Sequence, residues 1–169
     1  KARDELSLLK GAASTAFQQV RDFIFDLRPM MLDDLGLVPT VKRYTDHFRE
    51  KHNMEVSVQV TGSDRRLESY LEVMFFRAMQ ELLNNISLHS QATSVRVLLD
   101  MGMDLIKLTV EDDGKGFDPE GLTGDESGLG IKLIRDRAEM LGGDFVIDSS
   151  IGNGARIAIE LPVSSAELS

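Results

Sequence analysis

The sequence predicts an α/β (α+β) fold, a two-layer sandwich in which a mixed, mostly antiparallel sheet is covered by helices on one face. Strand-like segments come in neighbouring pairs joined by short turns, 95–99 with 105–110 and 145–147 with 157–161. Helical segments separate the other strands. A doubly wound parallel sheet would need strands and helices to alternate throughout, and that alternation is absent.

Composition narrows the class of protein. The chain has 169 residues, 42% hydrophobic and 28% charged, which are values typical of a globular domain with a core. It has no cysteine, so disulfides and cysteine-based metal sites are excluded. Its formal net charge of -9 argues against a nucleic-acid-binding domain. No apolar run approaches the length of a membrane span, and no signal-peptide pattern is present.

The first segment, 1–28, is predicted to be one long helix, ended by Arg28 and Pro29. Its apolar residues alternate by three and four in a heptad seam: Leu6, Leu9, Ala13, Ala16, Val20, Phe23 and Leu27. One helix with a single seam cannot bury that seam alone. We therefore expect an intermolecular or truncated bundle; the alternative is a terminal helix that packs back on its own domain.

The remaining elements follow from local periodicity and turn residues. In chain order they are a turn-rich connector at 30–40, a helix at 38–52, a strand at 54–60, a polar loop at 62–66, a helix at 68–88, strands at 95–99 and 105–110, a glycine-rich loop, a helix at 130–141, and strands at 145–147 and 157–161.

The helix 68–88 continues into residues of unusual type for its position. Glu81, Asn85 and His89 are spaced by four, so they are expected to project from one face beside an apolar stripe. Ordinary amphipathicity is the alternative explanation. Asparagine is a poor helix former, so Asn84 and Asn85 in mid-helix favour a functional site.

Three glycine motifs follow. In "DDGKG", Asp112 ends a strand and could accept hydrogen bonds from a ligand amine, with Gly114 and Gly116 allowing close backbone approach; a tight turn is the alternative. In "SGLG", Gly128 and Gly130 are predicted to open a helix whose free N–H groups could seat phosphate, although no P-loop motif is present. The acidic stretch 117–127 between them could close as a lid. In "GNGA", 152–155, a hairpin turn explains the glycines equally well.

Taken in order, E-x-x-x-N on a helix, D-x-G-x-G after a strand, G-x-G opening a helix and G-x-G before the last strand resemble the GHKL ATPase superfamily. Within it the chain resembles the catalytic domain of bacterial sensor histidine kinases, through "VRDFIFDLRP", "LDDLGL", "QELLNN" and "GLGIKLIRDRAEMLGG". The resemblance implies a Bergerat-type ATP-binding domain at 31–163. It implies that 1–30 is the second helix of a dimerisation hairpin.

The resemblance also implies residue roles. Asp112 would receive the adenine amine, Asn85 would hold Mg²⁺ through its side-chain oxygen, and Glu81 would be the acid/base residue. Backbone groups of Gly128 and Gly130 would bind the phosphates. The other expected ATP contacts are His89, Gly114, Gly116, Leu129, Gly154 and Ala155.

The implied function is ATP-dependent phosphorylation of a histidine and then of a response regulator, by a cytoplasmic domain that forms homodimers through its N-terminal helix. None of the three histidines lies on the heptad helix, so we expect the acceptor, and any membrane anchor, upstream of Lys1. Leu88 and Ala155 replace a basic residue and a threonine common in the family, which predicts weaker ATP binding. The alternatives are an anti-sigma-type serine kinase and a degenerate nucleotide-sensing or dimerisation module.

Overall fold

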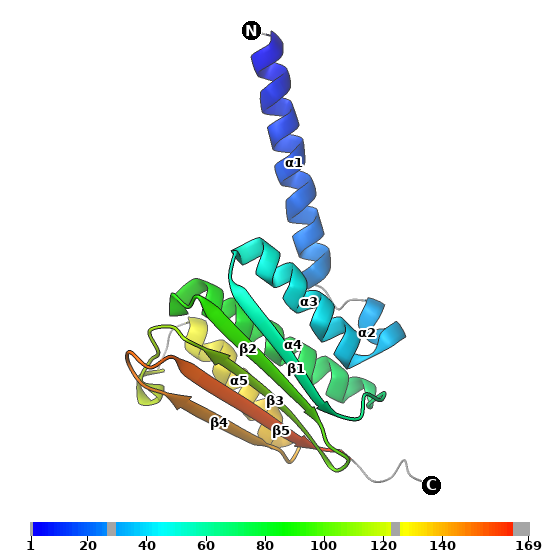
Figure 1. The fold of residues 1–169 in the computed structure, drawn as a ribbon, viewed down its shortest axis with the longest axis vertical. Coiled ribbons are helices and arrows are strands. Elements are labelled where there is room, and N and C mark those ends of the chain that lie inside the picture. The colour runs from blue at the N-terminus through cyan, green and yellow to red at the C-terminus, as the bar shows by residue number, and fades with distance from the viewer. Residues whose placement is uncertain (1, 27–29, 123–125, 164–169) are drawn as a thin grey trace.

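The computed structural model describes residues 2–26, 30–122 and 126–163 (Figure 1). Its elements in chain order are α1 (Ala2–Asp26), α2 (Met30–Leu35), α3 (Leu37–His52), β1 (Glu55–Gly62), α4 (Ser69–Asn85), the π-helical turn η1 (Ile86–Ser90), β2 (Ser94–Met101), β3 (Leu105–Asp112), the 3-10 turn η2 (Pro119–Gly121), α5 (Glu126–Met140), β4 (Asp144–Ser149) and β5 (Ala155–Pro162). The predicted α+β class with a long N-terminal helix is confirmed.

The five strands form one sheet in the order β1-β2-β3-β5-β4. β1 pairs with β2 in parallel, and the other three pairings are antiparallel. The mixed, mostly antiparallel sheet predicted from the short turns is therefore present. The parallel pair needs a crossover connection, and α4 supplies it.

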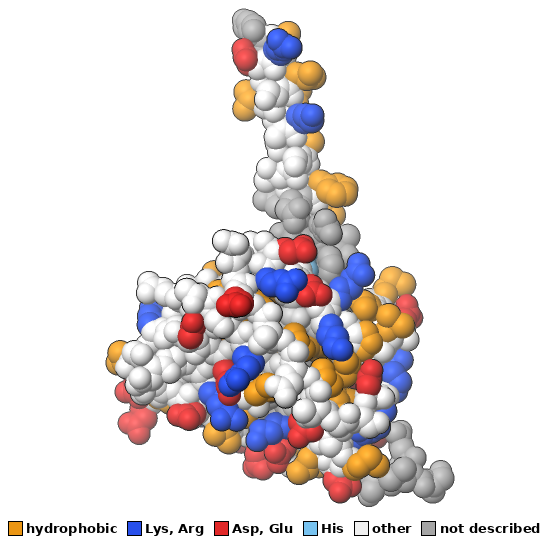
Figure 2. Space-filling model, viewed as in Figure 1, with side chains coloured by type: hydrophobic (Ala, Val, Ile, Leu, Met, Phe, Trp, Pro, Cys, Tyr) orange, Lys and Arg blue, Asp and Glu red, His pale blue; other side chains and the backbone are white. Residues whose placement is uncertain are grey.

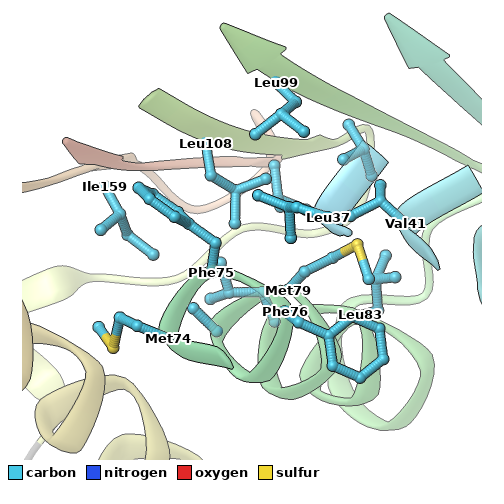
Figure 3. Packing of buried hydrophobic residues seen from close by; sticks show 14 of the residues in the cluster. Leu37, Val41, Met74, Phe75, Phe76, Met79, Leu83, Leu99, Leu108 and Ile159 are labelled. Atoms are coloured by element: carbon cyan, nitrogen blue, oxygen red, sulfur yellow. The ribbon is translucent and has the colours of Figure 1, made fainter. Parts of the chain in front are cut away.

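The helices α3, α4 and α5 cover one face of this sheet, as predicted (Figure 1). Strand residues that face the helices are apolar, and Leu99, Leu108 and Ile159 lie side by side on β2, β3 and β5. Figure 3 shows these three side chains pointing from the sheet toward Phe75 of α4. Phe75 is 1% exposed, so the apolar stripe of α4 is fixed against the middle of the sheet.

The opposite face of the sheet carries charged side chains of both signs (Figure 2). Glu111 on β3 pairs with Arg96 on β2 and with Arg156 on β5, in the latter case at 3.2 Å between Nε and Oε1. These cross-strand pairs explain why one face of each strand reads as polar.

Helix α1 extends away from the domain (Figure 1). Its seam residues Leu6 and Leu9 are each 68% exposed and Val20 is 57% exposed. The described part of the seam is thus uncovered, and a helix packed back on its own domain is not what the structure shows. Leu27 and the predicted end at Arg28 and Pro29 lie outside the described residues. Among the described helices, none has the length and apolarity needed to cross a membrane.

The connector predicted at 30–40 is partly helical, because a distant residue completes it. Leu32 of α2 is 1% exposed, and the guanidinium of Arg66 donates hydrogen bonds to the carbonyls of Leu32, Asp33 and Asp34 at the end of that helix. Arg66 Nε also lies 3.0 Å from Oε1 of Glu72 on α4. A six-residue helix is marginal alone, and this clamp stabilises its free carbonyls.

We expect Glu72→Ala to lower the free energy of unfolding by about 2–3 kcal/mol, because the buried carboxylate also accepts the Leu67 N–H at 3.0 Å. Chemical denaturation measures the loss. Glu50→Ala, the same change on the exposed side of α3, should stay within about 0.5 kcal/mol of the wild type. Equal effects of the two substitutions would contradict a structural role for the clamp.

Candidate functional site

The end of α4 differs from the continuous α-helix predicted at 68–88. After Asn85 the chain forms the π-helical turn η1, in which Ser90 Oγ donates to the Ile86 carbonyl at 2.8 Å. The Ser90 carbonyl accepts the N–H of Lys115 at 2.8 Å. Single π turns occur frequently at functional sites. Here the turn joins the end of α4 to the loop after β3.

That loop holds Asp112 in a fixed orientation. Asp112 Oδ1 accepts the N–H of Gly114 at 2.8 Å, which leaves the other carboxylate oxygen for a ligand. Partial burial raises the pKa of Asp112, although the hydrogen bond from Gly114 opposes the rise. Asp113 instead turns away to the start of β2, where hydrogen bonds from Ser94 and Thr93 lower its pKa.

Two of the glycine motifs pack against each other through their backbones. Gly116 and Gly154 both have positive φ, 64° and 69°. A Cβ on Gly116 would meet the Gly154 carbonyl, and one on Gly154 would meet the Asp112 carbonyl. Ser149 Oγ accepts the Phe117 N–H at 3.0 Å and donates to the Gly154 carbonyl at 2.9 Å. The turn 152–155 therefore supports the loop that carries Asp112.

These elements enclose a cavity of about 130 Å³ between α4, β3, β5 and α5. We call it the α4–β3 cavity. Asn85 at the end of α4 and Asp112 at the end of β3 both line it, so one ligand could contact both. The residues that line it are Leu82, Asn85, Ile86, His89, Ser90, Val110, Asp112, Lys115, Gly116, Phe117, Leu122, Ile131, Ala155 and Ile157.

The side-chain amide of Asn85 is the polar group in this wall that most needs a ligand. Its Nδ2 is buried and has no hydrogen-bond partner among the described residues. An unpaired buried amide costs about 1–3 kcal/mol, so a partner supplied by a ligand would relieve a real penalty. Because amide oxygen and nitrogen are interchangeable by a flip, the group fits either a phosphate oxygen or a metal ion.

Glu81 faces a different hollow. It lines a groove of about 510 Å³ between α4 and α5, together with Asn84 and Gly130. We call it the α4–α5 groove; it is also lined by Tyr44, Val73, Met74, Arg77, Ala78, Gln80, Leu133, Ile134 and Arg137. The first turns of α5 separate the groove from the cavity, since Ile131 lines one and Gly130 the other.

Helix α5 begins at Glu126, four residues before the predicted start. Gly128 and Gly130 therefore fall within its first turns. Gly128 and Leu129 therefore lie in the first turn of the helix, where backbone N–H groups and the positive end of the helix dipole are found together. Gly130, the fifth residue, falls inside the regular helical pattern. The Cζ atom of Arg135 lies 5.2 Å from the centroid of the Phe145 ring, so this side chain packs against β4 of the sheet.

The sequence profile of the histidine kinase-, DNA gyrase B- and HSP90-like ATPases matches residues 71–165. The chain belongs to this ATPase family.

Curated relatives place it among the ATP-binding domains of sensor histidine kinases. The signal transduction histidine-protein kinase/phosphatase DegS of Brevibacillus brevis is 33% identical over 99% of this chain and 43% of its own length. DegS of Bacillus subtilis is 37% identical over 81% of this chain and 37% of its own length. The oxygen sensor histidine kinase NreB of Staphylococcus carnosus is 32% identical over 95% of this chain and 46% of its own length. The chain thus spans less than half the length of these relatives.

A solved structure shares the fold. The blue-light activated histidine kinase of Erythrobacter litoralis EL346 superposes with a TM-score of 0.63 at 18% sequence identity, over 93% of this chain and 51% of that one.

The ATPase fold brings together part of the predicted site. Asn85, His89, Asp112, Gly116 and Ala155 line the α4–β3 cavity. Two of the other predicted residues lie beside the cavity, Gly114 against Ser90 and Gly154 against the Asp112 backbone. Glu81 lies in the α4–α5 groove, and α5 carries Gly128, Leu129 and Gly130.

The sequence missed the apolar lining of the cavity, chiefly Val110, Phe117, Ile131 and Ile157. Their pattern is the same as that of core residues, so periodicity alone does not separate the two.

Leu88, which replaces a basic residue, is 66% exposed. The predicted lid at 117–127 falls partly on residues 123–125, outside the described residues; Asp118 caps the turn η2 within it.

The loop contact gives a testable prediction with a matched control. Gly154→Ala and Gly152→Ala both place alanine at positive φ, 69° and 89°, which costs about 1 kcal/mol each. Only at Gly154 would the Cβ also strike backbone, so we expect its unfolding free energy to fall by about 2 kcal/mol more. Denaturation curves test this. If both substitutions lowered the free energy of unfolding equally, the close approach of Gly154 to the Asp112 backbone would not contribute to stability.

Proposed function

We propose that the chain is the catalytic domain of a sensor histidine kinase, which binds ATP in the α4–β3 cavity and transfers its γ-phosphoryl group to a histidine on a dimerisation helix. The observation that carries the proposal is the shared cavity: Asp112 and Asn85, whose amide Nδ2 is unpaired, line one hollow beside the first turns of α5. Phosphate would then pass to the aspartate of a response regulator.

The adenine ring would occupy the apolar part of the cavity. Val110, Ile131 and Ile157 provide a flat apolar lining, which suits a base. The free oxygen of the Asp112 carboxylate would accept the exocyclic amine, while Gly114 keeps the other oxygen occupied. A guanine would present a carbonyl oxygen there and would be repelled, so the same contact would favour adenine.

The triphosphate would extend toward α5. The first turn of that helix, with Gly128 and Leu129, would offer backbone N–H groups at its positive end. Asn85 would hold Mg²⁺ through Oδ1, and the ion would neutralise charge on the phosphates when bound. His89 and Lys115 line the mouth of the cavity and would contact the same ligand.

Transfer would use Glu81, which lies on the far side of the α5 N-terminus in the α4–α5 groove. An imidazole nitrogen would attack the γ-phosphorus, the bond to the β-phosphate oxygen would break, and ADP would leave. The imidazole N–H proton would pass to the Glu81 carboxylate. Catalysis would otherwise consist of positioning and charge stabilisation.

The exposed seam of α1 would pair with that of a second copy. Residues 1–30 would then belong to a dimerisation hairpin, and 31–163 to the ATPase domain. Because both ATP and a response regulator are cytoplasmic partners, we propose that the domain works in the cytoplasm.

We expect Asp112→Asn to weaken ATP binding about 10- to 100-fold, measured by calorimetry with Mg²⁺ present. If the asparagine oxygen keeps its bond to Gly114, its NH₂ group faces the adenine amine, donor against donor. The preference for ATP over GTP should narrow as well. Asp100→Asn, an equal change at an exposed site on β2, is the control. Unchanged ATP affinity in Asp112→Asn would exclude the proposed adenine contact.

We expect the chain to dimerise in sedimentation experiments, and Leu9→Glu to shift it to monomer because a charge would enter the seam. Ser14→Glu, off the seam on the same helix, should leave the dimer intact. Dissociation by both substitutions, or by neither, would contradict pairing through this seam.

The type of phosphorylated residue decides between a histidine kinase and a serine kinase. The chain, supplied with a phosphoacceptor hairpin and ATP·Mg²⁺, should form an acid-labile, base-stable product, as expected for phosphohistidine. An acid-stable product would favour a serine kinase, and absence of any ATP binding would favour a degenerate module.

A further inference from the structure

Glu81 and Gly130 are in direct contact across the α4–α5 groove. The Glu81 side chain is half-buried and reaches from α4 to the first turns of α5. An added Cβ on Gly130 would overlap Oε1 of Glu81 and would lie 2.7 Å from its Cδ and 3.1 Å from its Cγ. The space that the glycine leaves free is therefore filled by the Glu81 carboxylate itself.

Packing against Gly130 restricts the Glu81 side chain. Within the part of the chain that the structure describes, no hydrogen bond or ion pair to Glu81 is present. A free glutamate has three side-chain torsions and would sample several rotamers. The contact with α5 restricts that choice and directs the carboxylate into the groove.

Gly130 has no other evident need to be glycine. Its φ is not positive, so an alanine would fit the helical backbone and would even favour it by about 1 kcal/mol. Its N–H is in the fifth helical position, beyond the free donors of the first turn. Neither backbone conformation nor phosphate binding accounts for it.

We infer that Gly130 is a positioning residue that seats the Glu81 carboxylate for phosphoryl transfer. The inference rests on the proposed function, because Glu81 is taken there as the group that receives the imidazole proton. It assigns Gly130 to the transfer step and separates it from Gly128, which the proposed function places at the phosphates.

The test is Gly130→Ala. The added methyl group strikes only the tip of a flexible side chain, so the fold should persist while the carboxylate moves. In the full-length protein we expect the rate of histidine phosphorylation to fall about 10- to 100-fold, a typical loss for a misplaced acid/base group. The dissociation constant for ATP should stay within about twofold of the wild type.

Two further variants make the test specific. Gly11→Ala is the matched control, since it is also a helical glycine and has no atom within 4 Å of an added Cβ; its transfer rate should equal the wild type. In a Glu81→Ala background, Gly130→Ala should cause no further loss, because the two residues then act through one carboxylate.

A crystal structure of Gly130→Ala gives a readout that does not depend on activity, with Glu81 in a changed rotamer as the expected result. Loss of ATP affinity, wild-type transfer, or an unmoved Glu81 in this variant would overturn the inference. A wild-type protein that binds no ATP would instead overturn the proposed function, and the position of Glu81 in the variant structure would still decide the role of Gly130.

Discussion

The structure depends on how α4 packs against the centre of the sheet. Phe75, Met79 and Leu83 are each at most 1% exposed and hold one stripe of the helix between the sheet and its neighbouring helices. Replacing a buried phenylalanine by alanine typically costs about 3–5 kcal/mol, so this orientation is strongly enforced. Glu81 and Asn85, near the C-terminal end of α4, are therefore held half-buried, whereas Asn84 between them is exposed.

That constraint places two kinds of chemistry on two sides of α5. Asn85 faces the cavity that also contains Asp112, whereas Glu81, one helical turn earlier, faces the groove with Gly130. Four residues advance a helix by slightly more than one turn, which gives an offset of about 40°. The first turns of α5 lie between the cavity and the groove. In the proposed reaction, the nucleotide and the acceptor would therefore reach the phosphoryl group through different hollows.

Sequence patterns predicted what depends on local periodicity or on the order of motifs. Alternation in Val95–Leu99 and Ile157–Leu161 located strands within a few residues, and the motif order paired Asp112 with Asn85 across 27 positions. Contacts between distant residues were not predictable. Helix α2 depends on Arg66, and η1 forms where Ser90 meets Lys115. The division between Glu81 and Asn85 depends on where α5 packs, which no local pattern encodes.

The clamp at Arg66 links the N-terminal side of the ATPase domain to α4. One guanidinium holds the carbonyls at the end of α2 and the carboxylate of Glu72 at the start of α4. A displacement of α2 would therefore reach α4 through this group as well as through the direct packing of α2 on α3 and α4. Because α4 ends at Asn85, the helix that contacts the clamp near its N-terminus also carries the Asn85 amide at its C-terminus.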